Sequence, residues 1–203
     1  MIVIVDSGGA NLVSVISSIK RLGVDVIVSS SRQDIEKASH VILPGVGSAR
    51  NIMKRLNELK LVEVLRSLTR PVLGICVGMQ ILFEQSEEGP TPGLGIMRGR
   101  VEKLPMMPGL ILPHMGWNSL EAIKACRLMM GVPANAYVYY VHGFAAAVTP
   151  YTVMKSQHGV FFSAVVQHRN FMGVQFHPER SGKIGNQILK NFVEMSDDCL
   201  SCN

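Results

Sequence analysis

Short apolar runs rich in valine and isoleucine alternate with helical patterns through the first half of this chain. Runs that are almost wholly apolar are typical of strands buried on both faces of a parallel sheet. Between them, apolar residues recur with the period of a helix. The expected strands are Ile2–Val5, Val24–Val28, Val41–Leu43 and Pro71–Ile75, and the expected helices are Asn11–Leu22 and one within Ala49–Leu68. The pattern predicts an α/β fold with an open, mostly parallel sheet and helices on both faces.

The second half of the chain has a different pattern. Glycine and proline become frequent between Gly89 and Trp117, and strand-like runs then follow at Ala136–Phe144, Thr152–Ser156 and Ala164–Phe176. We expect these runs to form an antiparallel extension of the sheet, closed by a helix from about Lys183 to Met195. No internal repeat or linker interrupts the 203 residues. The chain therefore predicts a single domain over 1–203, in which about 196–203 is a polar tail.

Composition excludes several classes of protein. Hydrophobic residues make up 47% of the chain and charged residues 17%, as in a globular protein. No apolar run is long enough to cross a bilayer, and the N-terminal segment lacks the features of a signal peptide, so we expect a cytoplasmic protein without a membrane partner. The net charge of +5 comes from scattered lysines and arginines with few aromatics among them. We therefore expect no nucleic-acid partner.

Three of the four cysteines have simple interpretations. Cys199 and Cys202 have a CxxC spacing, but a structural zinc site needs about four ligands and no second pair is present. Cys126 is most simply a small buried apolar residue. We therefore expect neither a metal nor a cofactor.

The fourth cysteine, Cys76, lies in Gly74-Ile75-Cys76-Val77-Gly78, where an apolar strand meets a helical run. Glycines on both sides allow a tight turn that presents the side chain above the sheet. The turn also places the sulfur at a helix N-terminus, which favours the thiolate. The alternative is a buried structural cysteine with incidental glycines.

A candidate base ends another apolar run, Gly173-Val174-Gln175-Phe176-His177-Pro178-Glu179. His177 can take the thiol proton and later protonate the leaving group, and Glu179 can orient the ring and stabilise the imidazolium. Alone, His-Pro-Glu is more often a surface turn. On a strand beside that of Cys76, it predicts a catalytic triad.

A third segment, Pro44-Gly45-Val46-Gly47, also follows a strand and should lie at the same sheet edge. Attack on a carboxamide builds negative charge on its oxygen, which backbone N–H groups can stabilise. Gly45, Val46 and Val77 are the candidate oxyanion residues. The alternative is an ordinary loop between a strand and a helix.

Together these segments resemble the class I (triad-type) glutamine amidotransferases and, among them, the glutaminase subunits of imidazole glycerol phosphate synthases. GxCxGxQ with His-Pro-Glu marks the superfamily, and Met79 and the run Pro113–Asn118 mark the subfamily. The resemblance covers essentially the whole chain, in order: Ile4-Val5-Asp6, Ala10-Asn11-Leu12, Leu43–Gly47, Gly74–Gln80, Ser86-Glu87-Glu88, Pro113–Asn118, Tyr139–His142 and Gly173–Glu179.

The resemblance implies a flavodoxin-like fold and glutamine as the small-molecule substrate. Cys76 would form a γ-glutamyl thioester, with His177 as general base and acid and Glu179 orienting the ring. The residues implied to bind glutamine are Gln80, Glu88, Gly143 and Phe144.

The resemblance also implies a heterodimer with a (β/α)₈-barrel cyclase subunit. Ammonia would pass into the barrel, shielded from water that would protonate it. The products there would be imidazole glycerol phosphate and an aminoimidazole carboxamide ribotide, in histidine biosynthesis. The candidate interface residues are Pro113, His114, Met115, Gly116, Trp117, Asn118, Tyr139, His142 and Lys183.

Three segments depart from the commonest family pattern: Ser7-Gly8-Gly9-Ala10, Ala49-Arg50 and Gly143-Phe144. Of these, Gly143 removes a side chain near the expected glutamine site. Three other functions stay open. The same chemistry can serve another synthase, for example one that amidinates a nucleotide sugar. A cysteine hydrolase or peptidase on a similar sheet would leave Gln80 without a role, and a non-catalytic binding protein would not need a complete triad.

Overall fold

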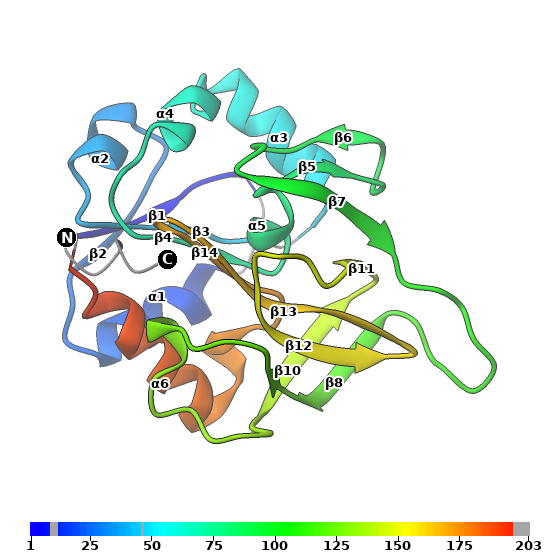
Figure 1. Cartoon of the computed structure of the whole chain (residues 1–203). Coiled ribbons are helices and arrows are strands. Elements are labelled where there is room, and N and C mark those ends of the chain that lie inside the picture. The colour runs from blue at the N-terminus through cyan, green and yellow to red at the C-terminus, as the bar shows by residue number, and fades with distance from the viewer. Residues whose placement is uncertain (9–11, 46, 197–203) are drawn as a thin grey trace.

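An eight-stranded sheet lies at the centre of the molecule, with the strand order β2-β1-β3-β4-β14-β13-β12-β9. The computed structural model describes residues 1–8, 12–45 and 47–196. The strands of this sheet are β1 (Ile2–Val5), β2 (Val26–Ser29), β3 (His40–Leu43), β4 (Val72–Ile75), β9 (Glu121–Ala122), β12 (Thr152–His158), β13 (Val160–His168) and β14 (Phe171–Val174). Figure 1 shows helices above and below the sheet.

Five neighbouring strands, from β2 to β14, run parallel. All residues of β1, β3, β4 and β14 are buried, because helices cover both faces of this part of the sheet. Since the carboxyl ends of parallel strands meet at one edge, residues that follow β3, β4 and β14 come together there. The predicted α/β fold with a mostly parallel sheet is confirmed.

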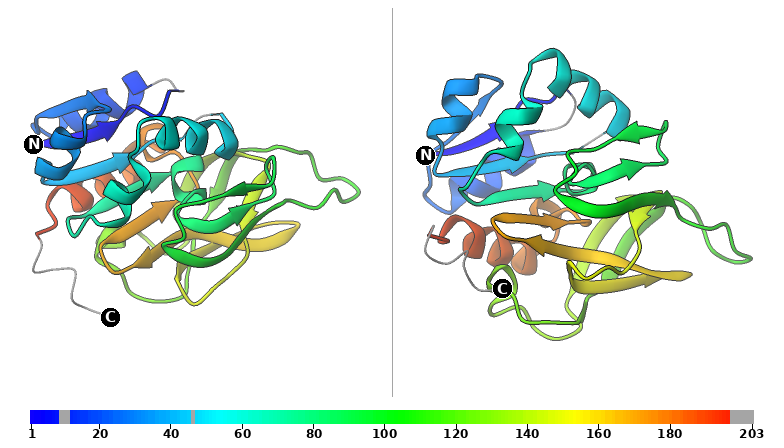
Figure 2. Two further views of the ribbon diagram at one scale, coloured as in Figure 1. Left: turned by 90° about the horizontal axis from the view of Figure 1, so that it is seen from above. Right: turned by 45° about the horizontal axis from the view of Figure 1, so that its top comes forward.

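The helices form two layers. Helices α1 (Leu12–Arg21) and α6 (Gly182–Val193) pack on one face, and α2 (Arg32–Lys37), α3 (Ala49–Glu58) and α4 (Val62–Arg66) cover the other (Figures 1 and 2). Ser31 and Ser48 cap α2 and α3, because each hydroxyl accepts a backbone N–H of the first turn. The short helix α5 (Val77–Gln80) follows β4 directly. None of these helices has the length and apolarity to span a membrane, as far as the chain is described.

The second half forms more than an extension of the main sheet. In the main sheet, β14 pairs antiparallel with β13, β13 with β12, and β12 with β9, as expected for an extension. Two small sheets stand apart from it, one of β8 and β10 and one ordered β11-β7-β5-β6. Their strands are β5 (Phe83–Ser86), β6 (Thr91–Pro92), β7 (Met97–Lys103), β8 (His114–Ser119), β10 (Tyr137–His142) and β11 (Phe144–Ala146).

Three expected elements were wrong in extent. The run Ala136–Phe144 belongs to neither one strand nor the main sheet, because Gly143 separates β10 from β11. The run Ala164–Phe176 is split by a turn in which Arg169 has a φ of 54°. The segment Ala49–Leu68 forms two helices, because Lys60, with a φ of 56°, ends the first of them.

Candidate active site

Cys76 occupies a strained turn between β4 and α5. Its φ of 53° and ψ of −111° lie outside the regions that residues with a side chain favour, as expected for a nucleophile elbow. A Cβ on Gly74 would overlap the backbone of Gly78, so the turn closes only with glycine there. The thiol is almost fully buried, with 4% of the residue exposed. The structure thus fixes the sulfur at the carboxyl edge of the sheet.

The loop after β3 packs directly against this turn. A Cβ on Gly45 would overlap the backbone of Val77 and Gly78, and one on Gly78 would overlap the carbonyl oxygen of Leu43. These close approaches bring the loop beside the start of α5, as expected for a site that stabilises an oxyanion. Gly45 and Val77 therefore lie together, whereas the predicted contribution of Val46 falls outside the described residues.

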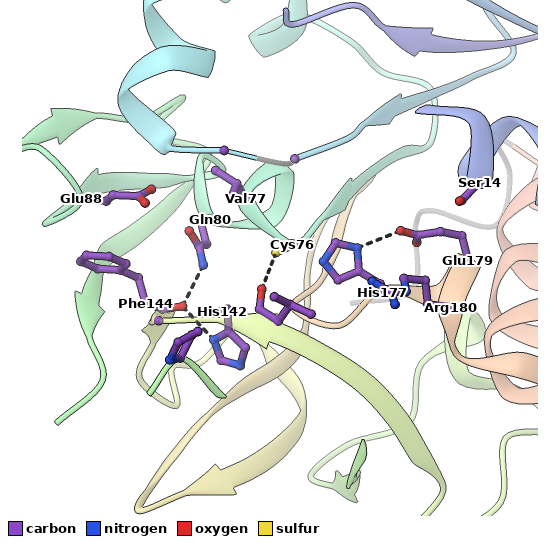
Figure 3. Close-up of a pocket in the computed structure, with 15 residues that line it drawn as sticks. Ser14, Cys76, Val77, Gln80, Glu88, His142, Phe144, His177, Glu179 and Arg180 are labelled. Atoms are coloured by element: carbon purple, nitrogen blue, oxygen red, sulfur yellow. Dashed lines mark hydrogen bonds and ion pairs between the residues drawn. The ribbon is translucent and has the colours of Figure 1, made fainter. Parts of the chain in front are cut away.

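His177 follows β14, the strand beside that of Cys76, and Glu179 lies on the side of its ring away from the sulfur (Figure 3). The Nδ1 of His177 lies 2.8 Å from Oε1 of Glu179, and the two side chains are only 10% and 8% exposed. The backbone N–H of His177 donates to the carbonyl of Tyr139, and its carbonyl accepts the hydroxyl of Ser181. A 3₁₀ turn over Pro178–Arg180 brings the carboxylate back to the ring. Figure 3 shows the other edge of the imidazole turned toward Cys76.

The surroundings of His177 keep its ring protonated. Burial alone would lower its pKa, but hydrogen bonds and charge interactions with Cys76 and Glu179 raise the pKa to about 10. The ring is therefore an imidazolium at neutral pH, and this cation is the natural partner of a thiolate. Because α5 has only four residues, its dipole is small, and His177 is the stronger influence on the sulfur.

The raised pKa of His177 can be tested on the ring itself. Glu179 is one of the two residues that raise the pKa of this ring from 6.5 to about 10. We therefore expect the imidazole to lose its proton at a lower pH in Glu179→Gln, which removes the carboxylate charge, than in the wild type. NMR titration of the His177 ring measures this, and an unchanged pKa in the variant would contradict the role given to Glu179.

A cavity of about 420 Å³ opens in front of the sulfur. Its lining includes every described residue that was selected for catalysis, for the oxyanion site or for glutamine binding: Gly45, Cys76, Val77, Gln80, Glu88, Gly143, Phe144 and His177, with Glu179 at its far end (Figure 3). The interface candidates Pro113 and His142 line it as well. The cavity has room for an amino acid of the size of glutamine, and Cys76 forms part of its wall.

The two polar residues selected for glutamine binding already have protein partners. Gln80 is 3% exposed, and its Nε2 donates to the carbonyl of Phe144 at 2.8 Å. Glu88 accepts the backbone N–H of Ala49 at 2.7 Å, which caps the start of α3. Both therefore combine a structural contact with a place in the cavity wall.

Most candidate interface residues lie on the two faces of the β8–β10 sheet, with Pro113 just before β8 and Lys183 on α6. Side chains alternate along a strand, so Met115 and Trp117 are exposed while His114 points inward. Tyr139 and Lys183 are accessible, and Pro113, Gly116 and Asn118 lie at or near the surface. His142 is also buried, and its Nε2 lies 2.9 Å from Nδ1 of His114. Both histidines were named as interface candidates; they are buried in this chain, and His142 lines the cavity, so their place in an interface stays a prediction.

Burial has a marked effect on both inward histidines. Desolvation lowers the pKa of His114 to about 4, with a further contribution from His158. Desolvation also lowers the pKa of His142 to about 3, against the effect of its hydrogen bond with the carbonyl of Phe144. Both rings are neutral at pH 7 and support the strand that forms one wall of the cavity.

Four further residues at the site were not selected from the sequence as functional. Ser14 and Arg180 line the cavity near Glu179, and the carbonyl of Val141 lies 3.7 Å from Cys76 Sγ. The Nε2 of Gln175 also lies 3.7 Å from this sulfur. A polar residue in the otherwise apolar run before His177 was the one available signal for Gln175. Among described residues, no group of histidine, cysteine or acidic side chains has the arrangement of a metal site, and Cys199 and Cys202 lie outside that range.

Comparisons with known proteins agree with this geometry. Residues 3–195 match the model of the family "Glutamine amidotransferase class-I". The chain is 49% identical over 195 residues to imidazole glycerol phosphate synthase subunit HisH of Xanthomonas euvesicatoria pv. vesicatoria, covering 96% of this chain and 98% of that protein. It is 47% identical to the subunit of the same name from Xylella fastidiosa, covering 96% and 97%.

Solved structures show the same fold at low sequence identity. The glutaminase domain of Trypanosoma brucei CTPS with bound acivicin matches with a TM-score of 0.66 at 14% identity, covering 96% of this chain and 94% of that one. PurLQS from Thermotoga maritima matches with a TM-score of 0.70 at 18% identity, covering 95% and 96%. Because the family model and close relatives span nearly the whole sequence, the chain belongs to the class-I glutamine amidotransferases and, within them, to the HisH subunits of imidazole glycerol phosphate synthase.

Proposed function

We propose that this glutaminase subunit hydrolyses glutamine with Cys76 as nucleophile, His177 as acid and base, and Glu179 as the group that orients and charges His177. One observation carries the proposal. A strained turn presents the Cys76 sulfur to a cavity, opposite an imidazole whose pKa a buried carboxylate and the thiol itself raise to about 10. A structural cysteine would need neither the strain nor this partner.

The reaction follows from this arrangement. The Cys76 thiolate attacks the side-chain carboxamide carbon of glutamine, and the negative oxygen turns toward backbone N–H groups of Val77 and the loop at Gly45. The C–N bond breaks as the His177 imidazolium gives its proton to the leaving nitrogen, which departs as ammonia. Water then attacks the thioester, His177 takes one of its protons, and glutamate leaves with the thiolate restored.

The ammonia is consumed by a partner subunit, which we infer to be a (β/α)₈-barrel cyclase. Ammonia released into water at neutral pH is protonated and ceases to be a nucleophile, so the two proteins must join around the exit from the cavity. The surface near that cavity carries the exposed side chains of Met115 and Trp117, 63% and 56% accessible, beside Tyr139. Exposed aromatic and methionine side chains are enriched at protein interfaces.

Three measurements of glutamine hydrolysis test this function. We expect near silence for the chain alone, a modest rise with the cyclase subunit, and a large rise when the ribonucleotide ligand of the cyclase is added. Full activity of the chain alone would contradict the proposed dependence on a partner. Activation by a nucleotide-sugar synthase in place of the cyclase would assign the chain to the alternative reaction.

A substitution at the exposed surface separates binding of the cyclase from the chemistry at Cys76. Trp117→Ala should weaken cyclase binding by about 30-fold, or about 2 kcal/mol, because a central aromatic anchor is lost. It should leave the reaction of Cys76 with iodoacetamide unchanged in the free chain, since Trp117 does not line the cavity. Titration by calorimetry gives the affinity. An unaltered affinity would remove Trp117 from the interface.

A further inference from the structure

Gln175 is a buried amide that contacts the reacting sulfur without belonging to the triad. It follows β14, two positions before His177, and none of its surface is exposed. Its Nε2 lies 3.7 Å from Cys76 Sγ, within the range of hydrogen bonds to sulfur, and its Oε1 lies 3.1 Å from Gln80 Nε2. An amide that is wholly buried keeps a defined orientation only if its two ends have matching partners.

A backbone carbonyl, that of Phe144, determines through Gln80 which end of the Gln175 amide faces the sulfur. The oxygen of Phe144 can only accept, so Gln80 must turn its NH₂ group toward it. The second hydrogen of that NH₂ points at Gln175, which must therefore present its oxygen. The NH₂ group of Gln175 is then left facing the sulfur. Reversing Gln175 would place two NH₂ groups against each other.

We propose that Gln175 is a positioning residue for the nucleophile: it donates an N–H to the Cys76 sulfur, and the Phe144 carbonyl holds it in that orientation through Gln80. The inference rests on the proposed role of Cys76 as nucleophile. It gives Gln80 a second task besides lining the glutamine cavity.

The two polar neighbours of the sulfur favour opposite protonation states. The carbonyl oxygen of Val141, which also lies 3.7 Å from the sulfur, can accept a hydrogen bond from the S–H group and so favours the thiol. The N–H of Gln175 is attracted to a negative sulfur and so favours the thiolate. With the proton on His177, the hydrogen bond to the Val141 carbonyl is absent and the hydrogen bond from Gln175 is stronger. Gln175 therefore holds the thiolate in place for attack.

Alkylation of the cysteine measures this effect without glutamine turnover. Gln175→Glu keeps the shape of the side chain and its contact with Gln80 but replaces the N–H donor by a carboxylate oxygen, which repels a negative sulfur instead of stabilising it. We expect iodoacetamide to modify Cys76 about three- to tenfold more slowly at pH 7, with the midpoint of the pH–rate profile moved to higher pH. The kcat for glutamine in the full complex should fall by a similar factor, with KM within about twofold. Peptide mass spectrometry distinguishes Cys76 from the other cysteines.

Two further variants keep the test decisive. Gln80→Met leaves Gln175 without its fixed orientation and should shift the profile in the same direction by less, which also serves if Gln175→Glu does not fold. Gln167→Met is the matched control, because Gln167 contacts a different thiol, Cys126, at 2.9 Å. It should leave the Cys76 profile unchanged.

The outcomes separate this inference from the proposed function. A folded Gln175→Glu protein with the wild-type pH–rate profile would overturn the role of Gln175. Glutaminase activity that survives loss of the Cys76 thiol would instead overturn the proposed function, and the alkylation profiles would still report on the contact between Gln175 and the sulfur.

Discussion

Cys76→Ala is expected to lower glutamine-dependent synthesis by at least ~10⁴-fold, because no other group in the cavity can form the thioester. Ammonia-dependent synthesis by the complex should stay within about twofold of the wild type. The substitution removes one sulfur atom from a site that is 4% exposed, so we expect a loss of only about 1 kcal/mol in stability and no loss of partner binding. Product formation from glutamine and from ammonium salt, measured in parallel, gives both numbers.

The control for this variant is Cys126→Ala. Cys126 is partly buried, and its thiol donates a hydrogen bond to Gln167. Neither residue lines the cavity. Burial raises the pKa of the Cys126 thiol, so it is the less reactive kind of cysteine. It should keep full activity with both nitrogen sources. Glutamine-dependent turnover that survives Cys76→Ala, or loss of ammonia-dependent turnover in the same protein, would contradict the assignment of the nucleophile.

The parallel half of the sheet could be predicted because its strands are defined by local signals. Ile2–Val5 is wholly buried and was predicted with its correct bounds. The strand before Cys76 is likewise a short apolar run that glycine and proline delimit. Once β3, β4 and β14 are parallel neighbours, the residues that follow them must meet at one edge. The positions of Gly45 and Cys76 therefore followed from the pattern of strands. The run before His177 was expected in the antiparallel extension, whereas β14 pairs parallel with β4 and so brings His177 to the same edge.

The remainder depended on tertiary contacts. The turn between β13 and β14 contains Arg169 in a left-handed conformation, and it has neither a glycine nor a proline from which the turn could be predicted. Lys60 ends α3 in the same way. The sheets β8–β10 and β11-β7-β5-β6 pair strands distant in the sequence, which a local pattern does not specify. For this reason the strand-like runs were found, but their partners were not.

The residues of the candidate site also divide into those that the sequence predicts and those that depend on tertiary contacts. The triad could be selected because each member has a chemistry that its neighbours support. Ser14 could not be selected, because it reaches the cavity from α1, and nothing in that helix indicates which residue lies near Glu179 (Figure 3). The inward position of His114 and His142 depends on the register of β8 with β10, where they pair. The role of Gln175 depends on hydrogen-bond directions, which only coordinates provide.

Gly78→Ala is expected to destabilise the chain by about 3 kcal/mol or more and to abolish glutamine hydrolysis. The added Cβ would overlap the carbonyl oxygen of Leu43, a backbone atom at the end of a wholly buried strand. A side chain can rotate away from such an overlap, but here either β3 or the start of α5 must move. Movement of either separates the loop at Gly45 from Val77, and the oxyanion loses its donors. Urea denaturation measures the stability, and the activity of the refolded fraction measures the second effect.

Gly143→Ala is the matched stability control, because the same methyl group overlaps no atom there. The nearest atom to its Cβ would be Cβ of Pro113 at 3.9 Å, an ordinary van der Waals distance. We expect its free energy of unfolding to stay within about 0.5 kcal/mol of the wild type. If both variants unfolded at the same urea concentration, the close approach of β3 to α5 would not be what fixes the oxyanion loop. A large difference between them would show that the turn at Cys76 requires glycine because two backbones touch.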